Sequence, residues 1–231
     1  MLKVIAFDLD GTLFDHQASA GNAIRRVVQE NSWGDSPDVE AKWQELEGIY
    51  FTQFANGEIT FEEQRRRRMV GLISFLGVDV EDSPEKYFHD YLRFYMWKSF
   101  PEVEDVLREL DDMGLPMAVL TNGESTQQNQ KLLQLGIAHY FELILASDEL
   151  LEFKPHPSSF LSISSFFGVE PHEVLYVGDN LEIDVIGATT AGLRAIWINR
   201  EPDLTESNNF ESSPNLSEVP RIVREINQRV L

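Results

Sequence analysis

The sequence predicts an α/β protein, in which helices cover a parallel β-sheet and an all-helical domain is inserted after the first strand. From residue 98 onward, short apolar runs alternate with helical patterns, as they do in strand-helix-strand units. Between residues 15 and 97 helix follows helix, with no convincing strand. We therefore expect two domains: an α/β core of residues 1–14 and 98–231, and a helical domain of residues 15–97.

The strands of the expected core are five short apolar runs, which suit strands buried on both faces. They are residues 3–8, 116–121, 142–147, 174–179 and 194–199.

Helices of the core follow from apolar spacing and from glycine or proline at their ends. We expect them at residues 103–113, before Gly136, at residues 157–168, at residues 183–191 and at residues 217–229. The polar stretch 201–216 should be a surface loop.

In the inserted region, an apolar stripe from Val39 to Phe54 predicts one helix. Thr60 with Glu63 forms a capping box before the next helix, and Ser83-Pro84 suits the start of another. The run Arg65 to Arg68 should be a solvated face paired with nearby glutamates, and the alternative is that one arginine reaches a cleft. We expect His16, just after the first apolar run, to be a surface loop residue, and the alternative is that it approaches a bound substrate.

Composition excludes several classes of function. The chain has 231 residues, 42% of them hydrophobic, and a formal net charge of -20, which disfavours nucleic acid and anionic membrane surfaces as partners. No apolar run reaches the length of a membrane helix or of a signal-peptide core. The chain contains no cysteine, which suits the cytoplasm. We expect a monomer or a homodimer.

Polar residues follow four of the apolar runs. The carboxyl ends of parallel strands share one edge of a sheet, where ligands bind in a crevice, so these side chains should converge. They are Asp8 and Asp10, then Thr121 and Asn122, then Lys154, and finally Asp179 with Asp184 beyond it.

The chemistry of this set points to a metal and a phosphoryl group. Several carboxylates in a desolvated crevice need a cation, and an all-oxygen site suits Mg2+. Lys154 and Thr121 could bind phosphoryl oxygens beside it. Asp8 and Asp10 share one face of their strand, so one could attack a substrate while the other moves protons.

The segments D-x-D-G-T at Asp8 to Thr12, the strand-end threonine of VLTN, Lys154 before proline, and G-D-x-x-x-x-D at Gly178 to Asp184 resemble the four motifs of the haloacid dehalogenase superfamily. The inserted helices resemble the type-1 cap of that family. The resemblance implies a Rossmann-like core with strand order 3-2-1-4-5.

The resemblance also implies roles for the catalytic pair. Asp8 would be the nucleophile that forms an aspartyl-phosphate, and Asp10 would act as general acid and then as general base. Because dehalogenases of the family typically lack the second aspartate, Asp10 favours phosphoryl transfer.

Ligand-binding roles follow in the same way. The resemblance implies that Asp8, the backbone carbonyl of Asp10, and Asp179 bind Mg2+. Asp184 would hold a metal-bound water or orient Lys154, and the phosphoryl oxygens would be bound by Thr121, Asn122 and Lys154.

The expected function is therefore that of a Mg2+-dependent phosphatase acting on a small phosphorylated metabolite, such as a nucleoside monophosphate, a sugar phosphate or a phosphorylated short acid. A phosphomutase of the β-phosphoglucomutase type shares all four motifs and is the alternative. A regulatory or binding module on an inactive scaffold is a third possibility, although such proteins usually lose the nucleophile or the metal-binding acid, and both are present here.

Overall fold

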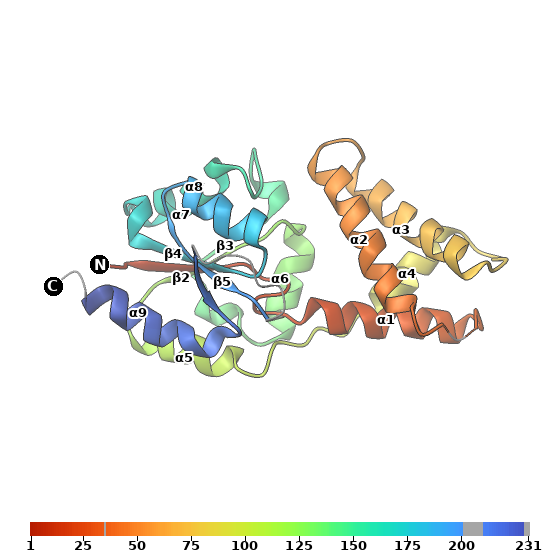
Figure 1. The fold of residues 1–231 in the computed structure, drawn as a ribbon, viewed down its shortest axis with the longest axis horizontal. Coiled ribbons are helices and arrows are strands. Elements are labelled where there is room, and N and C mark those ends of the chain that lie inside the picture. The colour runs from red at the N-terminus through yellow and green to blue at the C-terminus, as the bar shows by residue number, and fades with distance from the viewer. Residues whose placement is uncertain (35, 201–209, 229–231) are drawn as a thin grey trace. The chain divides into compact units, whose positions relative to one another are not determined.

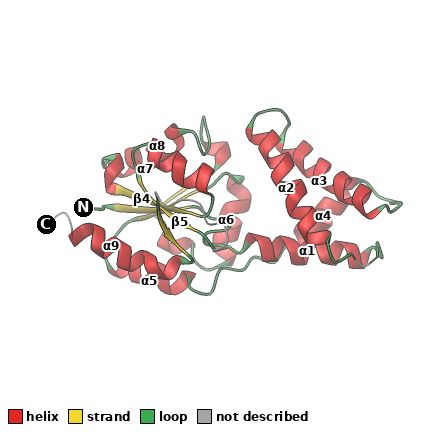
Figure 2. Cartoon of the chain, viewed as in Figure 1, coloured by secondary structure: helices red, strands yellow, loops and turns green. Residues whose placement is uncertain are grey.

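The computed structural model describes residues 1–34, 36–200 and 210–228 (Figure 1). The chain divides into two compact units, Met1–Asp15 with Trp97–Leu231 and His16–Met96. In the described residues the first unit contains a sheet with helices, and the second contains helices without strands (Figure 2). None of the described helices is long and apolar enough to cross a membrane.

Within the part of the chain that the structure describes, the first unit contains a six-stranded parallel sheet with the order β3-β2-β1-β4-β5-β6. The predicted α/β class and the predicted order of the first five strands are confirmed. Because β1 lies between β2 and β4, it is an inner strand, and its backbone is paired on both sides. The strands are β1 Val4–Phe7, β2 Met117–Leu120, β3 Leu143–Leu145, β4 Val174–Gly178, β5 Arg194–Ile198 and β6 Glu211–Ser213.

Helices cover both faces of this sheet. In Figure 1, α5 (Val103–Asp112) and α9 (Val219–Gln228) lie side by side on one face, and α7 (Pro157–Phe167) and α8 (Gly187–Thr190) lie on the other. Helix α6 (Ser125–Gln134) follows β2 directly. The shorter turns are η1 Ala138–Tyr140, η2 Ser147–Glu149, η3 Pro171–Glu173, η4 Leu181–Ile186 and η5 Leu216–Glu218.

Apolar burial holds these layers together. All four residues of β1 and of β2 are buried, as expected for strands covered on both faces. Helix α5 buries the stripe that its spacing predicts, through Val103, Val106, Leu107 and Leu110.

Two core segments differ from the sequence prediction. Residues 183–191 do not form one regular helix, because the π-helical turn η4 precedes the short helix α8. The predicted loop 201–216 is wrong for residues 211–213, which form the edge strand β6 beside β5. A short polar strand at a sheet edge carries no apolar alternation, so composition suggested a loop. Residues 201–209 lie outside the described residues.

The described residues of the second unit form four helices, α1 His16–Glu30, α2 Val39–Ala55, α3 Phe61–Leu76 and α4 Pro84–Phe94. Both predicted helix starts are confirmed. The side chain of Thr60 accepts a hydrogen bond from the backbone N–H of Glu63, and that of Ser83 accepts one from Lys86. Helix α3 ends at Gly77, which adopts the left-handed conformation with φ 63°.

Aromatic packing forms the core of this unit. Trp43 is fully buried, and its ring centroid lies 4.8 Å from that of Tyr91. The same cluster gathers side chains from all four helices, including Ile24, Leu72 and Phe88. These helices therefore share one hydrophobic core of their own.

The arginine run is only partly the solvated face that was predicted. Arg66 and Arg67 are within ion-pair distance of Glu63, but Arg68 is 5% exposed. Its guanidinium nitrogen lies 2.9 Å from Glu47 Oε1, and its guanidinium carbon lies 4.4 Å from the ring centroid of Trp43. Arg68 faces inward because helical geometry turns one of four consecutive residues toward the core.

Glu47 connects this arginine to His16. Glu47 Oε2 lies 2.8 Å from His16 Nε2, and His16 Nδ1 lies 2.6 Å from the hydroxyl of Tyr95. The prediction of a surface loop histidine is therefore wrong, because His16 begins α1 and is hydrogen-bonded on both ring nitrogens. Burial opposes ionisation of Glu47, but the charges of His16 and Arg68 outweigh it and lower the pKa of Glu47 from 4.5 to about 2.

We predict that Glu47→Gln lowers the free energy of unfolding at neutral pH. The free energy of unfolding of this variant should also change less as the pH falls. A carboxylate with a lowered folded-state pKa stabilises the fold above its unfolded pKa of 4.5, and this contribution, about 3 kcal/mol, is lost as the pH falls toward 2. Urea unfolding at pH 7, 5 and 3 measures it. Glu45→Gln on the same helix is the control, since Glu45 is exposed. Equal pH dependence in the two variants would contradict the assignment.

Candidate active site

The first motif begins where β1 ends. Asp8 continues the sheet through a hydrogen bond from its backbone N–H to the carbonyl of Val177, and it is 6% exposed. Its Oδ1 accepts a hydrogen bond from Lys154 Nζ at 2.7 Å. Its Oδ2 is buried without a hydrogen-bond partner among the described residues. A buried carboxylate oxygen with no donor is costly, so this atom is suited to a ligand.

A tight turn brings the rest of the motif against the end of β4. Gly11 has φ +97°, and a Cβ at this position would lie 2.2 Å from Asp179 Oδ2, so only glycine fits. The hydroxyl of Thr12 donates a hydrogen bond to Asp179 Oδ1 at 3.1 Å. The side chain of Asp10, on the same turn, is 30% exposed.

Lys154 lies at the centre of the site and is 2% exposed. Its ammonium donates to Asp8 Oδ1 and to Asp184 Oδ1, both at 2.7 Å, and to the hydroxyl of Tyr176 at 2.9 Å. Burial alone would favour the neutral amine, but Asp184 and Asp8 reverse this effect and raise the pKa of Lys154 above its usual value. The lysine therefore stays charged between two carboxylates.

The second motif supports the loop of Lys154. The side-chain amide of Asn122 donates to the backbone carbonyl of Lys154 at 2.8 Å and accepts from its backbone N–H at 3.0 Å. This amide is therefore taken up in holding the lysine loop, a contact that the sequence did not indicate. Thr121 is buried, and its Oγ1 accepts hydrogen bonds from Gln128 Nε2 and from the backbone N–H of Gly123.

Three carboxylates form a compact group. Asp8, Asp179 and Asp184 each offer an oxygen that lies within 4.8 Å of the others. Burial raises the pKa of Asp8, Lys154 opposes this shift, and the charges of Asp184 and Asp179 add to it. Burial and Asp184 likewise raise the pKa of Asp179 to about 6, against the opposing effects of Lys154 and Thr12. One lysine thus offsets only part of the negative charge.

The group has the chemistry of a magnesium site. All its donors are carboxylate oxygens, which hard divalent cations prefer, and the unpartnered Oδ2 of Asp8 faces no competing donor among the described residues. A cation there would lower the raised pKa values of Asp8 and Asp179 and keep both carboxylates ionised. The residues therefore fit Mg2+.

Contacts gather the seven residues singled out from the sequence into two groups. Lys154 contacts Asp8, Asp184 and Asn122, and Asp179 joins this group through the carboxylate cluster, whereas Asp10 and Thr121 form the second group. Asp10 is joined to Thr121 through Gln128, a residue that the sequence analysis missed together with Lys131 and Tyr176. Gln128 and Lys131 lie three residues apart on α6, directly after the second motif. Residues at this spacing lie on the same face of a helix, and this is the sequence feature that could have revealed Gln128 and Lys131 as site residues.

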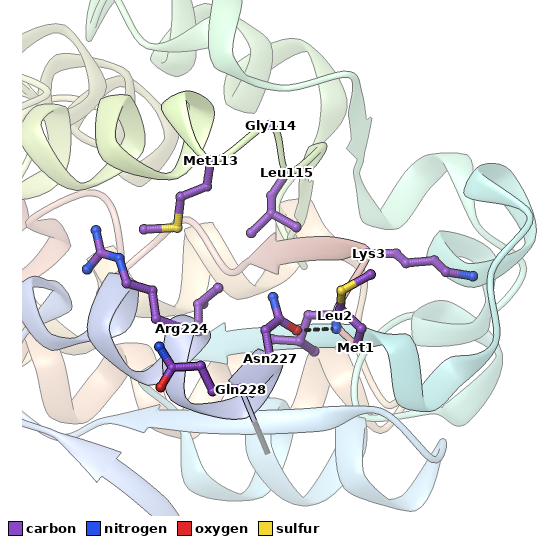
Figure 3. Close-up of a pocket in the computed structure, with 10 residues that line it drawn as sticks. Met1, Leu2, Lys3, Met113, Gly114, Leu115, Arg224, Asn227 and Gln228 are labelled. Carbon is purple, nitrogen blue, oxygen red and sulfur yellow. Dashed lines mark hydrogen bonds between the residues drawn. The ribbon is translucent and has the colours of Figure 1, made fainter. Parts of the chain in front are cut away.

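A separate pocket of about 590 Å3 lies beside the start of β1 in the same unit (Figure 3). Asn227 Oδ1 accepts a hydrogen bond from the backbone N–H of Leu2 at one side of it. Met113, Leu115 and Arg224 also line it, and none of the predicted site residues does. The predicted site residues are therefore not at this pocket, and Asp8 lies at the other end of β1.

Comparison with known proteins assigns a family. A family model described as haloacid dehalogenase-like hydrolase matches residues 2–192. A glyceraldehyde 3-phosphate phosphatase of Methanopyrus kandleri is 31% identical over 208 residues, which cover 87% of this chain and 85% of that protein. A phosphoserine phosphatase of Thermus thermophilus is 40% identical over 132 residues, or 57% of this chain and 51% of that protein. Haloacetate dehalogenase H-2 of a Moraxella species is 28% identical over 202 residues, which cover 86% of each chain.

Solved structures share the fold. YfnB of Bacillus subtilis bound to magnesium gives a TM-score of 0.85 at 22% identity and covers 96% of this chain and 99% of its own. L-2-haloacid dehalogenase of Xanthobacter autotrophicus gives 0.76 at 24% identity, with 97% and 99% covered. The family model spans residues 2–192, and the Methanopyrus relative covers most of the chain. This protein therefore belongs to the haloacid dehalogenase-like hydrolases and is an enzyme.

Proposed function

We propose that this enzyme hydrolyses a small phosphate monoester with Mg2+, through an aspartyl-phosphate on Asp8. The proposal rests on one observation, which is that the two carboxylate oxygens of Asp8 have different surroundings. Oδ1 of Asp8 is held by Lys154, whereas Oδ2 is buried with no hydrogen-bond partner among the described residues. A carboxylate oriented through one oxygen and unengaged at the other suits nucleophilic attack and metal binding.

In the first step an oxygen of Asp8 forms a bond to phosphorus while the bond to the ester oxygen breaks. The carboxyl group of Asp10 donates its proton to the departing alkoxide. In the second step the Asp10 carboxylate takes a proton from a water molecule that attacks the phosphorus. Inorganic phosphate leaves and the Asp8 carboxylate is regenerated. The partial exposure of Asp10 supports contact with substrate and water.

The transferring phosphoryl group is bound by Thr121, Asn122 and Lys154 in this proposal. The Lys154 ammonium neutralises charge on the phosphoryl oxygens, and Thr121 offers its hydroxyl. Asn122 contributes by holding the loop of Lys154 in place and by its own backbone, which follows the end of β2. The hydrogen bonds between the Asn122 amide and the Lys154 backbone support this assignment.

Mg2+ would be held by Asp8, by the backbone carbonyl of Asp10 and by Asp179. When bound it offsets the carboxylates and stabilises the charge of the transferring phosphoryl group. Asp184 orients Lys154 and supports the site from the second layer, as their 2.7 Å hydrogen bond suggests. The raised pKa values of Asp8 and Asp179 support the need for a cation.

The substrate class is a small phosphorylated metabolite. Two relatives are named for glyceraldehyde 3-phosphate and phosphoserine, both of which are short phosphorylated compounds. The net charge of -20 supports a small ligand over a nucleic acid polymer. We propose that the substrate is a phosphorylated short acid or aldehyde, a sugar phosphate or a nucleoside monophosphate.

We predict that the purified protein with Mg2+ releases inorganic phosphate from at least one monoester of such a panel without a bisphosphate primer. A colorimetric phosphate assay measures this, and heat-denatured protein is the control. Interconversion of hexose phosphate isomers only with a bisphosphate primer, and no phosphate release, would instead indicate the phosphomutase.

We predict that Asp8→Asn lowers the turnover number by at least about 10³-fold, because an amide cannot form the aspartyl-phosphate. The fold should survive, since the change removes one of three mutually repelling carboxylates. Circular dichroism and thermal unfolding check the fold, and Asp112→Asn on exposed α5 surface is the matched control. Near-normal phosphate release by the Asp8 variant would refute the nucleophile.

We also predict that EDTA abolishes phosphate release and that added Mg2+ restores it. Asp179→Asn should shift the Mg2+ concentration required for half-maximal activity upward, by about 10-fold or more, because it removes a proposed ligand. Titration of activity with Mg2+ measures both effects. Unchanged activity after exhaustive metal removal would contradict the magnesium site.

A further inference from the structure

We propose that Lys131 and Gln128 are positioning residues that together orient the carboxylate of Asp10 for proton transfer. This inference rests on the proposed function, in which Asp10 protonates the leaving group and later deprotonates water. Neither residue belongs to the four motifs identified in the sequence. Both project from α6, the helix that follows β2.

The first observation is the burial of Lys131. A lysine is almost never fully buried unless it is paired, yet Lys131 is 2% exposed. Its ammonium contacts Asp10 Oδ1 and lies 4.6 Å from the ring centroid of Phe14. Removing a lysine from water in this way requires a compensating carboxylate, and Asp10 provides it. The carboxylate is in turn fixed by a cation that has little freedom to move.

The second observation is the position of Gln128, one helical turn before Lys131. Gln128 Nε2 donates to Asp10 Oδ2 at 2.7 Å and to Thr121 Oγ1 at 2.8 Å. Both oxygens of Asp10 can accept hydrogen bonds whether the group is ionised or carries the proton that it donates, so the amide nitrogen of Gln128 suits either state. Each oxygen of Asp10 is thus held by a different donor from α6, and two such contacts define the plane of the carboxylate.

Gly123 makes this arrangement possible. A Cβ at Gly123 would lie 1.9 Å from Gln128 Nε2, so any larger residue would push the amide away from Asp10 and Thr121. The turn after β2 therefore admits Gln128 to the site. The same amide links the proposed acid to the proposed phosphate-binding hydroxyl across two strand ends.

The pair leaves Asp10 accessible. The side chain of Asp10 is 30% exposed although both its oxygens are held, whereas Asp8 and Asp184 are almost fully buried. An ion pair that served only to anchor α6 would have no need of an accessible carboxylate. A proton donor must be both oriented and accessible, because misplacement lowers the rate of proton transfer.

The test uses two esters of similar shape whose leaving groups differ in basicity, phenyl phosphate and 2,4-dinitrophenyl phosphate. Phenolate departs much more readily with a proton, and dinitrophenolate departs without one. In single-turnover measurements we expect Lys131→Met to slow phenol release by about 10 to 100-fold and dinitrophenol release by less than about threefold. With excess dinitrophenyl phosphate, a burst should precede slow steady-state turnover, because dephosphorylation of the aspartyl-phosphate by water still needs Asp10 as base.

Controls separate positioning from folding. Gln130→Ala changes an exposed residue of the same helix and should behave as the wild type. Lys131→Arg retains a cation and should recover part of the phenyl phosphate rate. Gln128→Leu should show the same leaving-group selectivity as Lys131→Met, so the inference stays testable if one variant folds poorly. Inhibition by inorganic phosphate should change by less than about threefold in the two Lys131 variants, because Lys154 and Thr121 with its partner Gln128 remain.

Equal losses with the two esters would overturn the positioning role and leave Lys131 as a structural anchor. Weakened inhibition by inorganic phosphate with no leaving-group selectivity would overturn it as well. Wild-type protein that releases no phosphate from these esters or from the metabolite panel would overturn the proposed function, and this inference with it. Activity in the wild type with unselective variants would overturn this inference alone.

Discussion

The buried ammonium of Lys154 makes the contacts on which the candidate active site depends. It is shared by Asp8 and Asp184, each at 2.7 Å, and by the hydroxyl of Tyr176. Without it, two carboxylates would face each other in a region that excludes water, at a cost of several kcal/mol. The backbone of Lys154 is itself held by two hydrogen bonds with the Asn122 amide. The second motif therefore helps to keep the Lys154 ammonium beside Asp8 of the first motif.

The parallel sheet explains why these groups meet. β1 lies between β2 and β4, so the residues that follow these three strands emerge at one edge. Side chains from residues as distant as Asp8 and Lys154 then come within hydrogen-bond distance. The residual negative charge of Asp8, Asp179 and Asp184 makes this edge attractive to a divalent cation, and a cation in turn makes it attractive to a phosphoryl group.

The helical unit obeys a different constraint. It has its own aromatic core around Trp43, together with a partly buried ionic group in which Glu47 contacts Arg68 and His16. Because the charges compensate one another, the group can lie beside apolar side chains. This unit is therefore held together by contacts within itself, and its stability has a pH dependence of its own.

The sequence by itself determined the α/β class and the helix starts at Thr60 and Ser83, because apolar periodicity and capping are local properties of the chain. The order of the first five strands followed instead from the resemblance of the four motifs to a known family. The sequence also singled out the polar residues at the strand ends. It did not reveal the edge strand β6, whose polar residues pair only through backbone, or the inward turn of Arg68.

Only the tertiary structure decided which side chains hold the proposed catalytic groups. Gln128 and Lys131 meet Asp10 across 118 and 121 residues of sequence, and Asn122 meets Lys154 across 32. Such contacts leave no periodic signal, because they depend on how strands and helices pack and not on neighbouring residues. The sequence thus indicated the chemistry, and the packing of α6 against the sheet edge determined how its central acid is oriented.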